Sequence, residues 1–356
     1  MVRYILPSVG DDVKLERQCP HCRRRCGVVH SGLHSRRIRD PKVSSIRQQR
    51  MKCPRCGTTW TLRPSGVKSG HQRSDRASAM GVLGYMLGMS YRGVAMFLWA
   101  LDCSSGKSSI ERDVAQVGVK ARALHRAAGK RLRVKVLGVD GTGAAMAGRD
   151  EGLLFLVDVG NQRLIGVEMM DESRADEVRD LVRDVMAQVG ATELRTDEHN
   201  SYEGIVPEGS HRLCLTHWRK SKGKRAWDFL RQAQEEQRPL EVKSMEELLA
   251  LLRKKPRSPT VPDELSRLVR SYIYARKGLP WKINHLLQHI ERTWEKVSDD
   301  PFDATNNTTE QIIGLTYKIR TKTMRGFKAK AKVLAHPYLS FYLRGQGGLC
   351  DLGKVV

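Results

Sequence analysis

Two pairs of closely spaced cysteines near the start of the sequence constrain the fold most. Cys19 and Cys22 form one Cys-x-x-Cys pair, Cys53 and Cys56 form a second, and a proline follows the first cysteine of each pair. Two thiolates three positions apart on a tight turn can bind one Zn²⁺ from the same side, and two such turns complete a tetrahedral site. The spacing therefore predicts a structural zinc ribbon over residues 1–66.

The 30 residues between the two pairs exceed the usual spacing in zinc ribbons, so the intervening hairpin has to be long. Two disulfides are the competing interpretation, which a cytoplasmic chain disfavours. Four other residues near the pairs are candidate zinc ligands, namely His21, Cys26, His30 and His34.

Positive charge is concentrated in two parts of the chain. The 356 residues include 63 Lys and Arg against 39 Asp and Glu, a formal net charge of +24. Residues 1–76 carry 18 basic and 5 acidic residues, and residues 311–344 carry 8 basic residues and no acid. An imbalance of this size indicates a polyanionic partner, and nucleic acid is favoured because no strongly amphipathic basic helix for a membrane surface stands out.

Apolar patterning argues against a membrane protein. The mean hydropathy is −0.47, and the apolar runs are far shorter than the roughly 18 residues that a membrane span needs. The first residues lack the apolar core and cleavage site of a signal peptide. These features predict a cytoplasmic, nucleoid-associated protein.

Helical periodicity begins after a linker rich in Pro, Gly and Ser, and it extends over residues 71–130. Ser90 is expected to cap a second helix, and Ser108 with Glu111 is expected to form a capping box for a third. Three short helices with one tight turn are typical of a helix-turn-helix DNA-binding domain, and a plain three-helix spacer is the alternative. The residues predicted to contact DNA lie at the start of the third helix and are Lys107, Ser109 and Arg112.

The pattern changes to that of strands after residue 133. Three consecutive strands joined by short turns predict an antiparallel meander, which a helix and two further short strands follow. The order of these elements resembles the ribonuclease H-like fold, an α/β architecture with a mixed sheet. The strands are expected at 134–139, 153–159, 164–170, 192–196 and 211–215, and the helix at 176–189.

Three acidic residues stand at positions where this fold would gather them. Asp140 lies at the end of the first predicted strand and Asp197 just after the fourth, and these two strands are neighbours in that fold. Glu310 follows an Asn-rich segment at the start of a predicted helix. Carboxylates are the ligands that Mg²⁺ prefers, and two divalent cations held this way can act on a phosphodiester. Three other acids are rival candidates, namely Glu151, Asp158 and Glu198.

Four motifs in order resemble those of the DDE-type transposases of bacterial insertion sequences, in particular the Mutator-like group. They are GVDGTG with Asp140, LRTDEHNSY with Asp197, the Cys-x-x-His of Cys214 and His217, and TNNTTEQ with Glu310. The match covers roughly residues 134–345.

The resemblance implies a ribonuclease H-like catalytic domain made of residues 133–217 and 302–345. An all-helical insertion would occupy residues 218–301, and residues 346–356 would form a tail. It also implies that Mg²⁺ or Mn²⁺ held by Asp140, Asp197 and Glu310 activates water to cut each transposon end and aligns the freed 3′-OH for attack on target DNA. Cys214 and His217 would support this site.

The expected partners are double-stranded DNA, as terminal inverted repeats and target, and a second copy of the chain in a homodimer on paired ends. A non-cleaving zinc and helix-turn-helix regulator and a ribonuclease H-like structure-specific nuclease, such as a junction resolvase, are the alternative functions. The basic segment 318–332 is predicted to follow a phosphate backbone on one helix and a turn. Its proposed DNA contacts are Lys318, Arg320, Lys322, Arg325 and Lys328.

Overall fold

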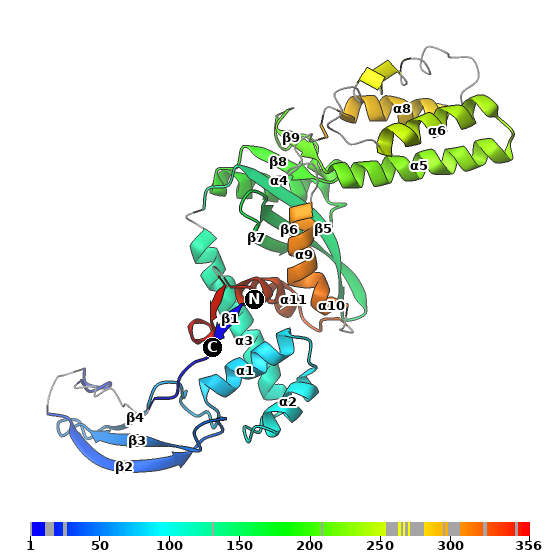
Figure 1. Ribbon diagram of the computed structural model, residues 1–356. Helices are drawn as coiled ribbons and strands as arrows, with labels where there is room; N and C mark the ends of the chain where they lie inside the picture. The colour runs from blue at the N-terminus through cyan, green and yellow to red at the C-terminus, as the bar shows by residue number, and fades with distance from the viewer. Residues whose placement is uncertain are drawn as a thin grey trace. The chain divides into compact units, whose positions relative to one another are not determined.

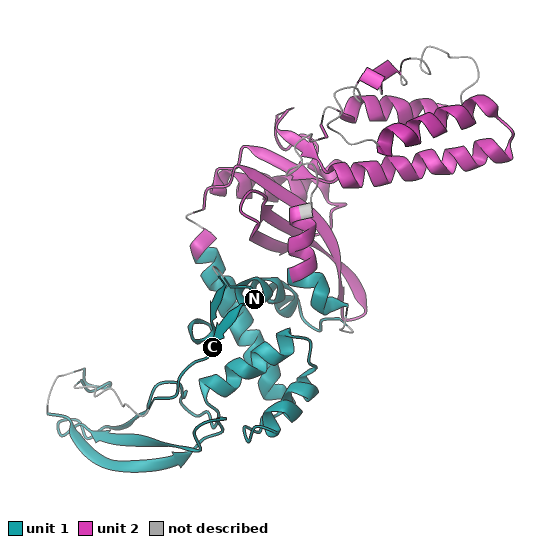
Figure 2. Ribbon diagram, in the orientation of Figure 1, with its two compact units in different colours: residues 1–127, 316–356 teal, residues 128–315 magenta. Residues whose placement is uncertain are grey.

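The computed structural model describes residues 2–10, 18–23, 27–129, 132–207, 209–253, 263–264, 266–267, 270, 281–294, 296–297, 307–322, 326–345 and 348–356. The chain divides into two compact units, residues 1–127 with 316–356 and residues 128–315 (Figure 2). The first unit therefore combines segments from both ends of the sequence.

A three-stranded antiparallel sheet in the order β2-β3-β4 begins the first unit (Figure 1). Its strands are β2 (Val29–Arg37), β3 (Ser45–Lys52) and β4 (Thr59–Leu62). The hairpin of β2 and β3 is long, as the spacing of the cysteine pairs predicts. Among the described residues the apolar core beneath it is small, with Ile38, Ile46 and Val67 as its buried members. A core of this size supplies little stability, so a bound metal would matter for folding.

Three helices follow in the first unit. They are α1 (Asp75–Met86), α2 (Tyr91–Trp99) and α3 (Lys107–Gly129). The Ser90 side chain accepts a hydrogen bond from the backbone of Gly93 and caps α2, as predicted. The predicted capping box of α3 is wrong. The helix already begins at Lys107, and the Glu111 carboxylate forms an ion pair with Lys332.

The last residues of the chain belong to the same unit. They form α11 (Lys330–Leu343), β10 (Leu349–Asp351) and the short 3-10 helix η3 (Leu352–Lys354). β10 pairs in parallel with β1 (Arg3–Ile5). Leu339, Leu352 and Val355 are buried in one apolar cluster with residues of α1, α2 and α3. The predicted tail at 346–356 and the assignment of residues 316–345 to the catalytic domain are therefore wrong, because these apolar side chains complete the helical core.

The second unit contains a five-stranded mixed sheet in the order β7-β6-β5-β8-β9. The first three strands are antiparallel, and β8 and β9 run parallel to β5. The predicted α/β class, the meander and the strand order along the chain are confirmed. The strands are β5 (Val136–Met146), β6 (Arg149–Asp158), β7 (Arg163–Met169), β8 (Glu193–Thr196) and β9 (His211–Leu213).

Helices lie against this sheet. The amphipathic helix α4 (Ala175–Val189) buries Val178 and Val182 in a cluster with Leu137 and Val139 of β5 (Figure 1). Because side chains alternate along a strand, Asp140 points to the opposite face from Val139. A second helix, α9 (Asn307–Ile313), contacts β5 and β6. It continues as the π-helix η2 (Gly314–Lys318) and α10 (Ile319–Thr321).

The described part of the insertion is helical, as expected. It contains α5 (Leu215–Glu235), α6 (Pro239–Arg253) and α8 (Trp281–Trp294), which share one apolar core. The predicted boundary at residue 218 falls inside α5. Its buried Trp218 donates a hydrogen bond to Thr293 Oγ1 (2.8 Å). Across the described residues, no helix combines the length and apolar character that crossing a membrane requires.

Candidate functional site

The four cysteines that the sequence singles out lie together. The Sγ atoms of Cys19 and Cys56 are 3.7 Å apart, those of Cys22 and Cys53 are 3.9 Å apart, and all four lie within 4.8 Å of one another. A tetrahedral zinc site with Zn–S bonds of about 2.3 Å places its sulfurs about 3.8 Å apart. A disulfide would need about 2.05 Å. The cluster fits one Zn²⁺ ion and does not fit two disulfides.

The backbone of each cysteine turn explains how its two thiols face the same point. Arg23 donates a hydrogen bond from its N–H to the Cys19 carbonyl, and Gly57 donates one to the Cys53 carbonyl, both at 2.9 Å. Both donors have positive φ angles, 55° at Arg23 and 70° at Gly57. Glycine adopts this conformation at little cost, which accounts for the glycine after Cys56.

The surroundings of the cysteines differ from one sulfur to another, since burial raises the pKa of Cys19 to about 11. A hydrogen bond between Cys56 Sγ and Thr58 Oγ1 (3.3 Å) lowers the pKa of Cys56. Within the described residues, no histidine belongs to the four-sulfur group, so His21, His30 and His34 are not its ligands. The remaining rival, Cys26, lies outside the described residues.

Asp140 lies within β5, with the strand continuing to Met146, and not at its end as predicted. Its side chain is buried. β5 pairs in parallel with β8 as far as Gly138 opposite Arg195, and Asp197 directly follows the end of β8 at Thr196. Burial, together with the charges of Asp197, Glu172 and Glu310, raises the pKa of Asp140 to about 7 against the lowering effect of His217. Asp197 is therefore near enough to Asp140 for its charge to act on it.

Glu310 stands on the first turn of α9, where the sequence predicts it. Its Oε1 lies 2.8 Å from Nε2 of His217, which is on the first turn of α5. Cys214 immediately precedes α5, so its sulfur and the His217 ring face the same side. The ligand atoms of Cys214, His217 and Glu310 all lie within 4.8 Å of one another.

His217 is held in its charged form. The hydrogen bond with Cys214, together with the charges of Cys214, Glu310 and Asp140, raises the pKa of His217 to about 9 against the lowering effect of burial. At neutral pH the histidine therefore forms a true ion pair with Glu310. His217 thus contacts Glu310, and Cys214 lies close to both.

The three predicted magnesium ligands are close, but they do not form one compact group. Asp140, Asp197 and Glu310 are not among the described sets whose ligand atoms all lie within 4.8 Å of one another. The charges of Asp197 and Glu310 nevertheless both raise the pKa of Asp140. The Glu310 carboxylate contacts His217.

A fourth acid near Asp140 was missed in the sequence. Glu172 follows β7, and its carboxylate accepts a hydrogen bond from the Tyr202 hydroxyl. A Cβ atom on Gly141 would lie 2.1 Å from the Glu172 carboxyl carbon, so a side chain at this position would displace the Glu172 carboxylate. Burial raises the pKa of Glu172, and the charge of Glu172 in turn raises that of Asp140. The glycine beside Asp140 is the signal that pointed to a close neighbour.

The three rival acids either contact other residues or lie further along the sheet from Asp140. Glu198 forms an ion pair with Lys222 (2.7 Å) and contacts His289 Nε2 (2.9 Å), both in the helical insertion. Asp158 accepts hydrogen bonds from the backbone and side chain of Asn161 in the turn between β6 and β7. Glu151 pairs with Ala144, four residues beyond Asp140 along the hairpin.

The predicted DNA contacts are mostly on the surface. At the start of α3, Lys107 and Arg112 are exposed and Ser109 is half-buried. In the C-terminal segment of the first unit, the exposed residues are Lys318, Lys322 and Lys328. Arg325 lies outside the described residues. The basic segment forms two helices, α10 and α11, and not one.

The prediction that Arg320 contacts DNA is wrong. Its side chain is buried, and its guanidinium donates hydrogen bonds to the carbonyls of Gly88 (2.8 Å) and Met89 (2.9 Å). It also lies over the Tyr85 ring, 4.5 Å from the centroid. Arg320 is therefore a structural residue that ties the end of α1 to α10, and it is not available to DNA.

Comparison of the chain with protein-family models and with curated proteins finds no match. A function for this chain has to be inferred from the chemistry of these residues.

Proposed function

We propose that this chain is a DNA transposase of the DDE type, which cuts the ends of a mobile element and joins the freed 3′-OH to target DNA. The observation that carries the proposal is the acidic neighbourhood of Asp140, Asp197 and Glu310 on a mixed sheet. The strand order β7-β6-β5-β8-β9 supports it, because it is the order expected of a ribonuclease H-like domain with Asp140 on its central strand.

The donor atoms fit a hard divalent cation. Carboxylate oxygens are the preferred ligands of Mg²⁺ and Mn²⁺. Burial and mutual repulsion raise the pKa of Asp140, and a cation held by these acids would remove that repulsion. Asp140, Asp197 and Glu310 would hold the ions. The chemistry that bound ions supply is stabilisation of charge on the attacking and leaving oxygens of the phosphodiester.

The surrounding residues position these ligands. Asp140 is fixed on a central strand, whereas Glu310 is held by His217 and has to turn from it to share a cation with the aspartates. His217 would then neutralise developing negative charge nearby, because its pKa is raised to about 9. Tyr202 holds Glu172 beside β5.

The first unit would bind the DNA. Four cysteines would hold Zn²⁺ and fix the N-terminal sheet, and the exposed basic residues Lys107, Arg112, Lys318, Lys322 and Lys328 would contact phosphates. A net charge of +24 supports such a partner. Two copies of the chain would pair two DNA ends.

Strand cleavage and joining test the proposal. The purified chain is incubated with Mg²⁺ or Mn²⁺, a supercoiled plasmid and duplexes carrying the inverted repeats that flank its gene. We expect cut ends that become joined to the plasmid. Asp140→Asn should lower the rate by about 10³-fold, which corresponds to about 4 kcal/mol of lost transition-state stabilisation. Binding of the ends should change by no more than a few fold.

Glu151→Gln is the matched control, because it removes a carboxylate from the adjacent strand away from the cluster. It should cut normally. Wild-type rates from Asp140→Asn would contradict the proposal. Cutting without joining would indicate a structure-specific nuclease instead, and binding without cutting would indicate a regulator.

A further inference from the structure

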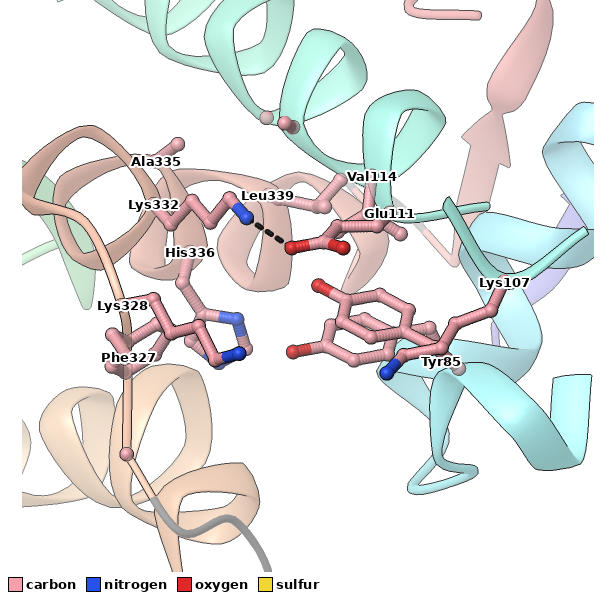
Figure 3. A pocket seen from close by; sticks show the side chains of 14 residues that line it. Tyr85, Lys107, Glu111, Val114, Phe327, Lys328, Lys332, Ala335, His336 and Leu339 are labelled. Carbon is pink, nitrogen blue, oxygen red and sulfur yellow. Dashed lines mark hydrogen bonds and ion pairs between the residues drawn. The ribbon is translucent and has the colours of Figure 1, made fainter. Parts of the chain in front are cut away.

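A pocket of about 140 Å³ lies within the first unit (Figure 3). Its walls come from the helices α1, α2, α3 and α11 and from the residues just before α11. A cavity of about 150 Å³ lined by apolar side chains holds a benzene molecule. The pocket is therefore large enough for one six-membered aromatic ring.

A buried histidine with one unpartnered ring nitrogen lines the pocket. His336 is 4% exposed, and its Nε2 has no hydrogen-bond partner in the described part of the chain. Its ring packs against Phe327, with the centroids 5.5 Å apart. Burial lowers the pKa of His336 to about 4, so the ring is neutral and its two nitrogens comprise one donor and one acceptor. A buried polar atom without a partner is unfavourable, and a ligand that bonds to it would remove that cost.

Two tyrosines face the histidine. The rings of Tyr85 and Tyr91 are stacked, 4.4 Å apart and nearly parallel. In Figure 3 the hydroxyl of Tyr85 points toward His336 across the pocket. Hydroxyls both donate and accept, so the interior offers neutral hydrogen-bonding groups on aromatic walls, which suit the edge of a heterocyclic base.

The rim of the pocket is cationic. Lys332 forms an ion pair with Glu111, and Lys107 and Lys328 are close enough for their charges to lower the pKa of Glu111. Three lysines therefore surround one carboxylate, and Lys107 and Lys328 are exposed. An interior without charge and a rim with excess positive charge match a base that carries a phosphate.

We propose that this pocket binds a single unpaired nucleotide, with a pyrimidine-sized base against His336 and Tyr85 and its phosphate on Lys107 and Lys328. The source would be a base turned out of the duplex in the DNA end, as distinct from a free mononucleotide. This identification of the source rests on the proposed function, since it takes DNA as the ligand of the first unit. Turning a paired base out of the duplex costs stacking and pairing energy, and this cost is smaller for a base that is already unpaired.

Binding measurements on the full chain, made without divalent cations, test the proposal. Titration calorimetry is carried out with dTMP, dAMP and inorganic phosphate. A second series compares a duplex that has one unpaired thymine near its end with the same duplex fully paired. We expect dTMP to bind more tightly than dAMP or phosphate, and the unpaired thymine to strengthen duplex binding about tenfold.

The variants His336→Phe, Tyr85→Phe and Lys328→Ala should each reduce the preference for the unpaired base by about tenfold. Lys354→Ala is the matched control, because this exposed lysine does not line the pocket and is not among the proposed DNA contacts, and it should keep the preference. Should His336→Phe fail to fold, Tyr85→Phe and Lys328→Ala remain decisive. Equal binding of dTMP and phosphate, or variants that behave as wild type, would overturn the proposal.

The two sources give different results. Binding of dTMP with no gain from the unpaired thymine would overturn the DNA-end source and assign the pocket to a free nucleotide. The proposal is also separable from the proposed function, because no cleavage is measured. A chain that prefers the unpaired base but never cuts keeps the pocket and loses the transposase assignment. A chain that cuts without any preference for the unpaired base loses the pocket alone.

Discussion

Two glycines that follow Asp140 on β5 differ in the space around them. A Cβ on Gly141 would meet the Glu172 carboxylate at 2.1 Å, whereas a Cβ on Gly143 would meet nothing within 4 Å. The two residues lie on the same strand, so they have similar backbone requirements. This pair isolates the contribution of Glu172 from the general effect of adding a methyl group to the strand.

We expect Gly141→Ala to lower the free energy of unfolding by about 1–3 kcal/mol, because the methyl group forces Glu172 away from Tyr202. Gly143→Ala should leave it unchanged or raise it by up to about 1 kcal/mol. Urea denaturation followed by circular dichroism measures both. Equal effects of the two changes would show that Glu172 does not occupy the position above Gly141.

Individual residues also mark where sequence reasoning stops. Asp140, Asp197 and Glu310 could be chosen because motifs surround them, and the rivals Glu198 and Asp158 could not be excluded by the sequence alone. Glu198 is occupied by Lys222 and His289, which are 24 and 91 positions away in the sequence. Such pairing depends on tertiary contacts, which no local pattern encodes.

At the scale of elements, periodicity located the strands and the amphipathic α4, because burial on one face leaves a regular pattern. β5 nevertheless continues seven residues past its predicted end, to Met146. Periodicity did not identify the charged residue that is buried inside the protein. Arg320 has the sequence surroundings of a surface cation, yet it packs on Tyr85 and donates hydrogen bonds to the backbone at the end of α1. The capping box was misplaced because Glu111 found a more distant partner in Lys332.

Replacing Arg320 tests this junction of α1 with α10. Arg320→Met should destabilise the first unit by about 2–4 kcal/mol, because two buried carbonyls lose their donors. Lys322→Met, which changes an exposed neighbour, should cost less than about 0.5 kcal/mol. Denaturant melts of both variants compare them. If Arg320→Met folded as stably as wild type but bound DNA more weakly, the residue would be a surface contact after all.

At the scale of the whole molecule, two compact units divide the functions that we propose. Sequence reasoning placed residues 316–356 with the catalytic sheet or in a tail, whereas they complete the helical core of the first unit. Contacts between the two ends of a chain are set by the complete fold, so local patterns do not reveal them. The division predicts that damage to the cysteine cluster remains confined to the first unit.

Loss of the zinc ligands tests that division. The wild-type chain should contain about one zinc ion. Cys53→Ser should lose it, weaken DNA binding by about tenfold or more, and raise hydrogen exchange in β2, β3 and β4. Exchange in β5, β6 and β8 should stay as in wild type. His34→Ala, at a rejected candidate ligand, should keep its zinc. Loosening of both units in Cys53→Ser would contradict independent stability.

The position of manganese most directly tests the central claim that Asp140, Asp197 and Glu310 share divalent cations. Crystals of the full chain with Mn²⁺ would be measured at a wavelength where manganese scatters anomalously. The account predicts an anomalous peak between the two aspartates, with Glu310 turned from His217 to join them. A metal peak only between Cys214, His217 and Glu310, with no density beside Asp140, would contradict it.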